Sequence, residues 1–161
     1  MDAISGLAAQ VLDLAREHEA KLATAESCTG GLVSAALTGI PGSSSVVDRG
    51  FVTYSNEAKS ELLGVPMILI ETHGAVSEDV ARAMAEGALA RSHAQFAVSI
   101  TGVAGPGGGT DAKPVGLVWF AIAGAGRTTQ TLERRFGDVG RAQVRALSVE
   151  TALTLFRDAL G

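Results

Sequence analysis

Cysteine, excess charge of one sign and long apolar runs are all scarce in this chain of 161 residues. The single cysteine, Cys28, excludes an internal disulfide, and a formal net charge of -4 offers no basic surface for nucleic acid or an anionic membrane. No apolar run approaches the roughly 20 residues that cross a bilayer, and the first residues lack the order of a secretory signal. We therefore expect a cytoplasmic protein that binds neither nucleic acid nor membranes.

Histidine is equally rare, with three residues that are not spaced like metal ligands. Motifs such as H-x-x-x-H and H-x-E are absent, and one cysteine cannot build a zinc site. We therefore predict that the protein uses no metal and no organic cofactor. The isolated histidines are also poor candidates for a catalytic base.

Small and apolar residues are abundant: 47% of the chain is hydrophobic and 20 residues are glycine. This composition favours a small-residue α/β core with tight backbone turns. The length fits one domain over residues 1–161. Nearly continuous apolar runs at 96–100 and 115–123 predict strands covered on both faces. We predict a single three-layer α/β/α domain with a mixed, mostly parallel sheet.

Turn residues and periodicity predict the outer elements. A Gly-Ala-Gly turn at 124–126 leads into the mixed segment 128–136, which indicates an antiparallel edge hairpin. Residues 45–54 are rich in β-branched and aromatic side chains but interrupted at 48–50, which predicts a strand with a bulge or a kink. Helical spacing or capping patterns predict helices at 4–15, 77–91 and 139–159.

The stretch TAESCTGG at residues 24–31 runs from an apolar segment into a pair of glycines and a helix. Ser27 would then lie at the carboxyl edge of the sheet, where open α/β sheets bind ligands. At the start of the following helix, the backbone N–H groups of Thr29, Gly30 and Gly31 would be free to hold an oxyanion. The alternative is that Ser27 or Thr29 is a plain helix N-cap.

Cys28 is a rival nucleophile, because the N-terminus of a helix lowers the pKa of a thiol. Cysteine is, however, among the residue types most often buried as a small apolar side chain. From the residues alone the choice between Ser27 and Cys28 stays open.

A nucleophilic serine needs a base, and Lys59 stands in an unusual place for a lysine. If Asn56 is the N-cap of a helix, Lys59 occupies its third position, where the helix dipole disfavours a cation by ~0.3–1 kcal/mol. Partial burial would lower its pKa further and provide a neutral amine, as in Ser-Lys hydrolases. Tyr54 could then relay the proton. The alternative is a solvated lysine on a surface helix.

Five segments of the chain resemble the competence/damage-inducible CinA C-terminal family, and the resemblance runs from about residue 8 to the end. The segments are TAESCTGGLVSAAL, DRGFVTYSNEAKSELLGV, HGAVSEDVARAMAEGAL, AVSITGVAGPGGGTDAKPVGLVWFAI and RAQVR. The resemblance implies an amidohydrolase that deamidates nicotinamide mononucleotide to nicotinate mononucleotide and ammonia, in pyridine nucleotide salvage. Some relatives carry a second, N-terminal domain, and this chain is similar to the standalone form.

The resemblance also implies the roles of individual residues. It makes Ser27 the nucleophile, with Lys59 and Tyr54 as its catalytic partners, and it implies a homo-oligomer. The family usually has G-D-R directly before its last helix, whereas GDVGRAQVR here delays the arginine, so that Arg141 departs from the family spacing.

The ribose and phosphate of such a nucleotide need anchors. The glycine-rich loop TGVAGPGGGT, residues 101–110, has backbone N–H groups able to form an anion-binding nest. The expected substrate-binding residues, besides the oxyanion donors, are Thr101, Gly102, Gly105, Gly107, Asn56, Arg49 and Arg141. Since fold and motif alone never establish catalysis, the alternative function is a non-catalytic regulatory module that binds a nucleotide or phosphate.

Overall fold

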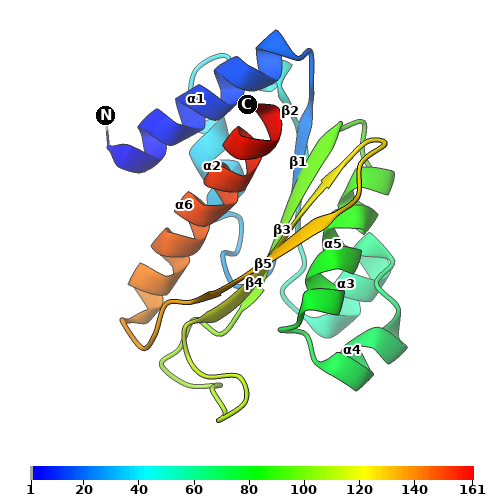
Figure 1. Cartoon of the computed structure of the whole chain (residues 1–161), viewed down its shortest axis with the longest axis vertical. Coiled ribbons are helices and arrows are strands. Elements are labelled where there is room, and N and C mark those ends of the chain that lie inside the picture. Colours follow the sequence, from blue (N-terminus) through cyan, green and yellow to red (C-terminus); the bar gives the residue numbers. More distant parts are fainter. Residues whose placement is uncertain (1) are drawn as a thin grey trace.

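The computed structural model describes residues 2–161, which form helices packed on the strands of one sheet (Figure 1). The strands are β1 (Leu22–Glu26), β2 (Val47–Val52), β3 (Phe96–Gly102), β4 (Leu117–Gly124) and β5 (Gln130–Arg135). The helices are α1 (Ala3–Glu17), α2 (Leu32–Thr38), α3 (Asn56–Leu63), α4 (Met67–His73), α5 (Glu78–Ala90) and α6 (Arg141–Leu160), with a 3-10 turn at Ser43–Ser45. Over residues 2–161, none of these helices combines the length and apolarity needed to cross a membrane.

The five strands form one mixed sheet in the order β2-β1-β3-β4-β5. Strand β1 pairs in parallel with β2 and with β3, whereas β4 pairs antiparallel with both β3 and β5. The predicted edge hairpin is therefore confirmed as β4–β5. Because β1 and β3 lie side by side and point the same way, their carboxyl ends, at Glu26 and Gly102, meet at one edge of the sheet.

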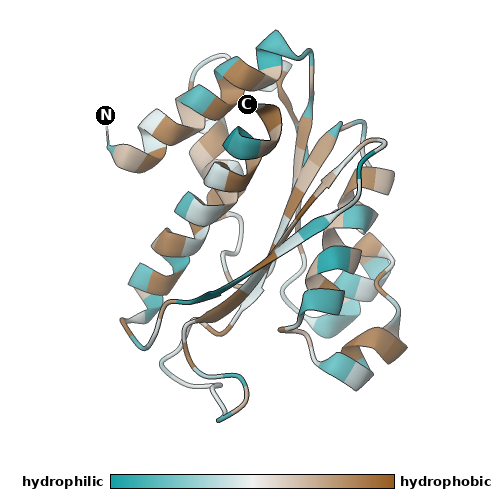
Figure 2. Cartoon of the chain, in the orientation of Figure 1, coloured by the Kyte–Doolittle hydropathy of each residue, from teal (hydrophilic) through white to brown (hydrophobic). Residues whose placement is uncertain are grey.

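Helices cover both faces of this sheet, which confirms the predicted three layers. Helices α1, α2 and α6 lie on one face, and α3, α4 and α5 lie on the other (Figure 1). Strand residues alternate between the two cores: Leu22 packs toward the first group of helices, and Ala23 and Ala25 pack toward the second. Figure 2 shows the hydrophobic residues concentrated in the sheet, with hydrophilic residues along the outer sides of the helices.

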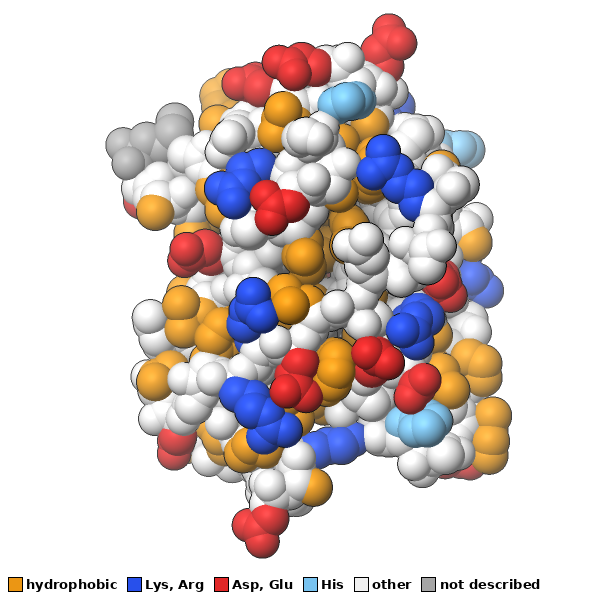
Figure 3. All heavy atoms as spheres, viewed as in Figure 1, with side chains coloured by type: hydrophobic (Ala, Val, Ile, Leu, Met, Phe, Trp, Pro, Cys, Tyr) orange, Lys and Arg blue, Asp and Glu red, His pale blue; other side chains and the backbone are white. Residues whose placement is uncertain are grey.

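Charges of both signs are dispersed over the outer surface. Figure 3 shows acidic and basic side chains interspersed on the face that it presents, without an extended patch of one sign. The ion pairs are surface contacts, such as Arg16 with Asp13 and Arg82 with Glu78. Exposed pairs of this kind contribute little to stability.

The edge strand β2 contains the predicted bulge. Leu22 pairs with Val47, but the next residue, Ala23, pairs with Arg49, so that Asp48 is the extra residue. A bulge of this kind bends the strand and re-aims its side chains.

Helices α3 and α5 approach each other closely at Gly87. A Cβ atom added at Gly87 would lie 2.0 Å from the carbonyl oxygen of Leu63, the last residue of α3. This backbone contact leaves no room for a side chain, so α3, which carries Lys59, keeps a fixed spacing from α5.

Replacing Gly87 with alanine should lower the free energy of unfolding by about 1–3 kcal/mol, the usual cost of overpacking. The matched control is Gly6→Ala in α1, where nothing lies within 4 Å of the added Cβ. That change should raise the free energy of unfolding by roughly 0.5–1 kcal/mol, because alanine is the better helix former. Urea denaturation measures both values, and an equal response of the two variants would contradict the close packing of α3 on α5.

Candidate active site

Ser27 and Lys59 meet at the carboxyl edge of the sheet. Ser27 follows β1 directly, and Lys59 lies near the start of α3, with its Nζ 3.0 Å from Ser27 Oγ. The N-cap of α3 is Ser55, whose hydroxyl accepts the N–H of Ala58 at 3.0 Å. Lys59 is therefore the fourth helical residue and not the third, as the assumption of an Asn56 cap implied.

The Lys59 side chain is buried and has no acidic partner. It is 1% exposed, and its Nζ lies 2.8 Å from the carbonyl oxygen of Thr53 and 3.4 Å from that of Tyr54. Within residues 2–161 no ion pair includes Lys59. Burial lowers the pKa of Lys59, because a charged amine is poorly solvated there.

These contacts serve the Lys59 amine in either protonation state. With three N–H donors, a protonated Lys59 donates to the Ser27 hydroxyl and to the carbonyls of Thr53 and Tyr54. A neutral amine has two N–H donors and one lone pair, so it can keep both carbonyl contacts and accept the hydroxyl proton of Ser27. The arrangement can therefore activate a serine hydroxyl.

Cys28 lines the same cavity as Ser27 but is poorly suited to act as the nucleophile. Its side chain is buried, and burial raises the pKa of the thiol to about 11. The thiolate is the reactive form of cysteine, so burial makes Cys28 a weaker nucleophile near neutral pH. Of the two candidates, geometry and charge favour Ser27.

Tyr54 contacts the pair in a way that the sequence did not predict. Its carbonyl oxygen faces Lys59, whereas its hydroxyl accepts a hydrogen bond from Arg141 Nη2 at 3.1 Å. The side chain is 63% exposed. The expected proton relay through the Tyr54 hydroxyl therefore has no hydrogen bond to Ser27 or Lys59 to support it.

The backbone N–H groups predicted to hold an oxyanion are mostly occupied. Gly30 N–H donates to the carbonyl of Ser27 at 3.0 Å, and Gly31 N–H donates to Glu26 Oε1 at 3.2 Å. The prediction for these two glycines is therefore wrong. In the part of the chain that the structure describes, the N–H groups of Cys28 and Thr29 have no protein acceptor.

Glu26 is the residue that occupies the backbone N–H groups at the start of α2, and the sequence interpretation missed it. Its fully buried carboxylate accepts the N–H groups of Val33 and Ser34 at 3.0 Å each and the hydroxyl of Thr29 at 2.7 Å. It thus caps α2 in place of the N-cap residue, Gly31, which has no side chain. The one hint in the sequence is an acidic residue at the end of an otherwise nearly apolar strand.

A cavity of about 210 Å³ opens beside the pair. It contains four of the predicted binding residues, whereas Gly107 lines a separate cavity of about 570 Å³. The predicted residues in the first cavity, besides the catalytic ones, are Asn56, Thr101, Gly102 and Arg141. Gly105 adjoins this group, because its carbonyl accepts Arg141 Nη1 at 2.8 Å.

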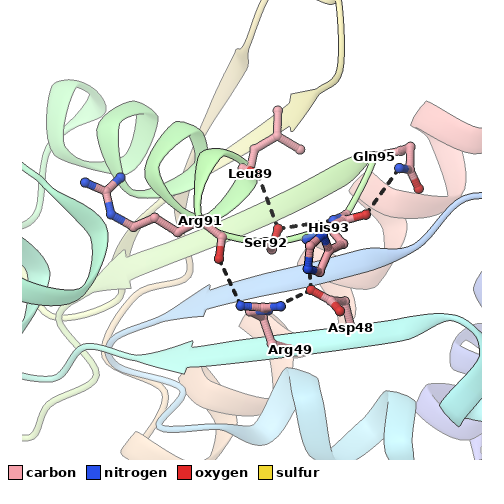
Figure 4. Close-up of polar contacts among 8 residues, drawn as sticks. Asp48, Arg49, Leu89, Arg91, Ser92, His93 and Gln95 are labelled. Carbon is pink, nitrogen blue, oxygen red and sulfur yellow. Dashed lines mark hydrogen bonds and ion pairs between the residues drawn. The ribbon is translucent and has the colours of Figure 1, made fainter.

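Arg49 does not belong to the site, contrary to the prediction. Its Nε pairs with Asp48 at 2.7 Å, and its Nη1 donates to the carbonyl of Arg91 at 3.1 Å (Figure 4). Asp48 also accepts the N–H of His93 at 3.0 Å. Arg49 therefore ties the bulged edge strand to the turn after α5, and the bulge explains why its direction could not be read from simple alternation.

Arg145 is the second residue that the sequence interpretation missed. It lies one helical turn after Arg141 in α6, and it donates from Nε to the carbonyl of Cys28 at 3.1 Å and from Nη2 to that of Thr29 at 3.3 Å. Two arginines four positions apart repel each other on a helix, which is a weak sequence indication that both have specific partners. No cluster of metal-ligating side chains occurs among residues 2–161.

Comparison with known proteins gives a consistent match. The profile of the family described as CinA C-terminal domain matches residues 4–160. A CinA-like protein of Synechococcus sp. (strain CC9902) is 52% identical over 151 residues, which are 94% of this chain and 36% of that protein. A CinA-like protein of Mycobacterium marinum is 57% identical over 141 residues, or 87% of this chain and 33% of that protein. The chain therefore spans about a third of the length of these curated relatives.

Solved structures match over nearly the whole chain. The competence/damage inducible protein CihA from Agrobacterium tumefaciens superposes with a TM-score of 0.96 at 49% identity, covering 99% of this chain and 96% of that one. The competence damage-inducible protein A (ComA) from Klebsiella pneumoniae gives a TM-score of 0.93 at 37% identity, covering 99% and 98%.

The Cys28 thiol should react slowly with iodoacetamide in the folded protein. Because its pKa is about 11 instead of the ordinary 9.0, the thiolate fraction at pH 8 is lower. Two pKa units correspond to ~100-fold less thiolate, and hence to ~100-fold slower alkylation than in the urea-unfolded chain. Mass spectrometry of timed samples measures both rates. Equal rates would contradict the buried, protonated thiol.

Proposed function

This chain belongs to the CinA C-terminal domain family, and from that premise we propose that it is an amidohydrolase that converts nicotinamide mononucleotide to nicotinate mononucleotide and ammonia. The resemblance of its motifs to this family suggests the substrate. The observation that carries the chemistry is the buried Lys59 amine, 3.0 Å from the Ser27 hydroxyl and without an acidic partner in the described chain.

In the first step, Ser27 Oγ attacks the carboxamide carbon on the pyridine ring while neutral Lys59 accepts the hydroxyl proton. The resulting tetrahedral intermediate carries its negative charge on the former carbonyl oxygen. The unpaired N–H groups of Cys28 and Thr29 stabilise that oxygen, as the N–H after the nucleophile does in many hydrolases. Loss of one such donor typically costs about 2.7–4 kcal/mol of barrier.

In the second step, the C–N bond breaks and protonated Lys59 returns its proton to the departing nitrogen, which leaves as ammonia. Ser27 then holds the nicotinate group as an ester. Lys59, neutral again, takes a proton from water, which attacks the ester and releases nicotinate mononucleotide with Ser27 restored. Each turnover consumes one water. Since only neutral Lys59 can act as the base, the rate rises with pH through the lowered pKa of Lys59.

The cavity accommodates the reacting end of this substrate. Its volume of about 210 Å³ lies below the ~300–1,000 Å³ of sites that enclose a whole ligand. We assign this space to the pyridine carboxamide. The ribose and phosphate then extend toward Asn56 and Arg141 at the rim, where Arg141 supplies a positive charge for the phosphate.

Ammonia release from nicotinamide mononucleotide tests the proposal with three variants. Ser27→Ala and Lys59→Ala should each lower kcat by at least ~10²-fold, the lower range for loss of a general base. Cys28→Ala should keep most of the activity, because the thiol takes no part and its backbone N–H remains. A coupled glutamate dehydrogenase assay measures the ammonia.

Two results would contradict the proposal. Activity that survives in Ser27→Ala but disappears in Cys28→Ala would make Cys28 the nucleophile. A folded wild-type protein that binds the nucleotide without releasing ammonia would favour the regulatory module instead.

A further inference from the structure

The Arg145 guanidinium donates hydrogen bonds to the backbone of the turn that carries Ser27. The side chain is half-buried, and its two hydrogen bonds go to the carbonyls of Cys28 and Thr29. No carboxylate among residues 2–161 lies within ion-pair distance of it. Partial burial of an arginine without an acidic partner is unfavourable, so its contacts are better explained by a role in the site than by stability.

Glu26 holds the same turn from the other side. Its carboxylate takes the Gly31 N–H and the first free N–H groups of α2, while Gly30 N–H bonds within the turn to the carbonyl of Ser27. Between them, Glu26 and Arg145 leave two N–H groups of the turn without protein acceptors in the described chain, those of Cys28 and Thr29. Of these two residues, Cys28 lines the cavity, and Thr29 follows it in the turn.

A single peptide unit links Arg145 to one of these donors. The carbonyl of Cys28 and the N–H of Thr29 belong to the same planar trans peptide and point in opposite directions. When Arg145 Nε binds that carbonyl at 3.1 Å, it also fixes the direction of the Thr29 N–H, away from α6. A cation on the carbonyl further polarises the peptide and strengthens its N–H as a donor.

We propose that Arg145 is a positioning residue that orients and strengthens the Thr29 N–H as the oxyanion donor for Ser27. This inference rests on the proposed function, because an oxyanion forms only if Ser27 attacks a carbonyl carbon. The contribution of Arg145 is made in the transition state and little in substrate binding. Its loss therefore lowers kcat and leaves KM nearly unchanged.

The test compares Arg145→Gln with Arg141→Gln, one helical turn earlier, by kcat and KM for nicotinamide mononucleotide. Arg145→Gln should lower kcat by about 10-fold to 10²-fold, part of the effect of losing a whole oxyanion donor, with KM within ~3-fold of wild type. Arg141→Gln should mainly raise KM, since Arg141 lines the cavity and contacts no atom of the turn in the described structure.

Arg145→Lys is the control for a folding defect, because it keeps the positive charge but replaces the forked guanidinium by a single ammonium group. It should fold with a melting temperature close to that of the wild type and show a smaller loss of kcat than Arg145→Gln. An increase in KM with kcat unchanged in both Arg145 variants would overturn the proposal and make Arg145 a substrate anchor. Unchanged kcat and KM would overturn it as well.

p-Nitrophenyl acetate separates this inference from the proposed function, because its hydrolysis at Ser27 needs the oxyanion donors but no nicotinamide. Ser27-dependent hydrolysis that falls in Arg145→Gln supports the role of Arg145 even if nicotinamide mononucleotide is not deamidated. Deamidation with unaltered kcat in Arg145→Gln overturns the inference and leaves the function standing. Absence of any Ser27-dependent reaction with either substrate contradicts both.

Discussion

The contact between the buried Lys59 amine and the Ser27 hydroxyl is the interaction on which the candidate site depends. A lysine that is 1% exposed loses most of the hydration of its charged form, so burial lowers its pKa. In the proposed mechanism, this lowered pKa lets the amine act as a base. Lys59 is buried because the start of α3 packs against the carboxyl end of β1. At this edge of the sheet, the residues that follow the parallel strands β1 and β3 lie in a shared cleft.

The second buried ionisable group, Glu26, has the opposite environment. Its carboxylate accepts several N–H and hydroxyl groups, so its burial is compensated by hydrogen bonds, whereas Lys59 has mainly carbonyl acceptors around it. One group holds the turn after β1 rigid, and the other is held close to Ser27. Functional sites commonly contain such a division between a carboxylate held by many donors and a buried amine whose charged form is disfavoured.

Local patterns in the sequence predicted the hairpin and the interruption of strand β2 at 48–50, because each depends on residues close together in the chain. The residues alone left open the choice between Ser27 and Cys28 and the alternative of a solvated Lys59, and the family resemblance implied the pair. The misassigned residues depend on distant partners. Gly30 and Gly31 looked free because the capping carboxylate of Glu26 was not recognised, and the Tyr54 hydroxyl turns toward Arg141, 87 residues away. Helix α4 was not predicted, because it follows Pro66 and has no capping side chain to mark its start.

The central claim, that Lys59 is a buried amine with a lowered pKa beside Ser27, is tested most directly by NMR titration of lysine side chains labelled with carbon-13 in the folded protein. The missing resonance in Lys59→Arg assigns the signal. The account predicts that Lys59 titrates below the ordinary value of 10.5, since burial disfavours its charged form. Titration of Lys59 at or above that value would contradict it.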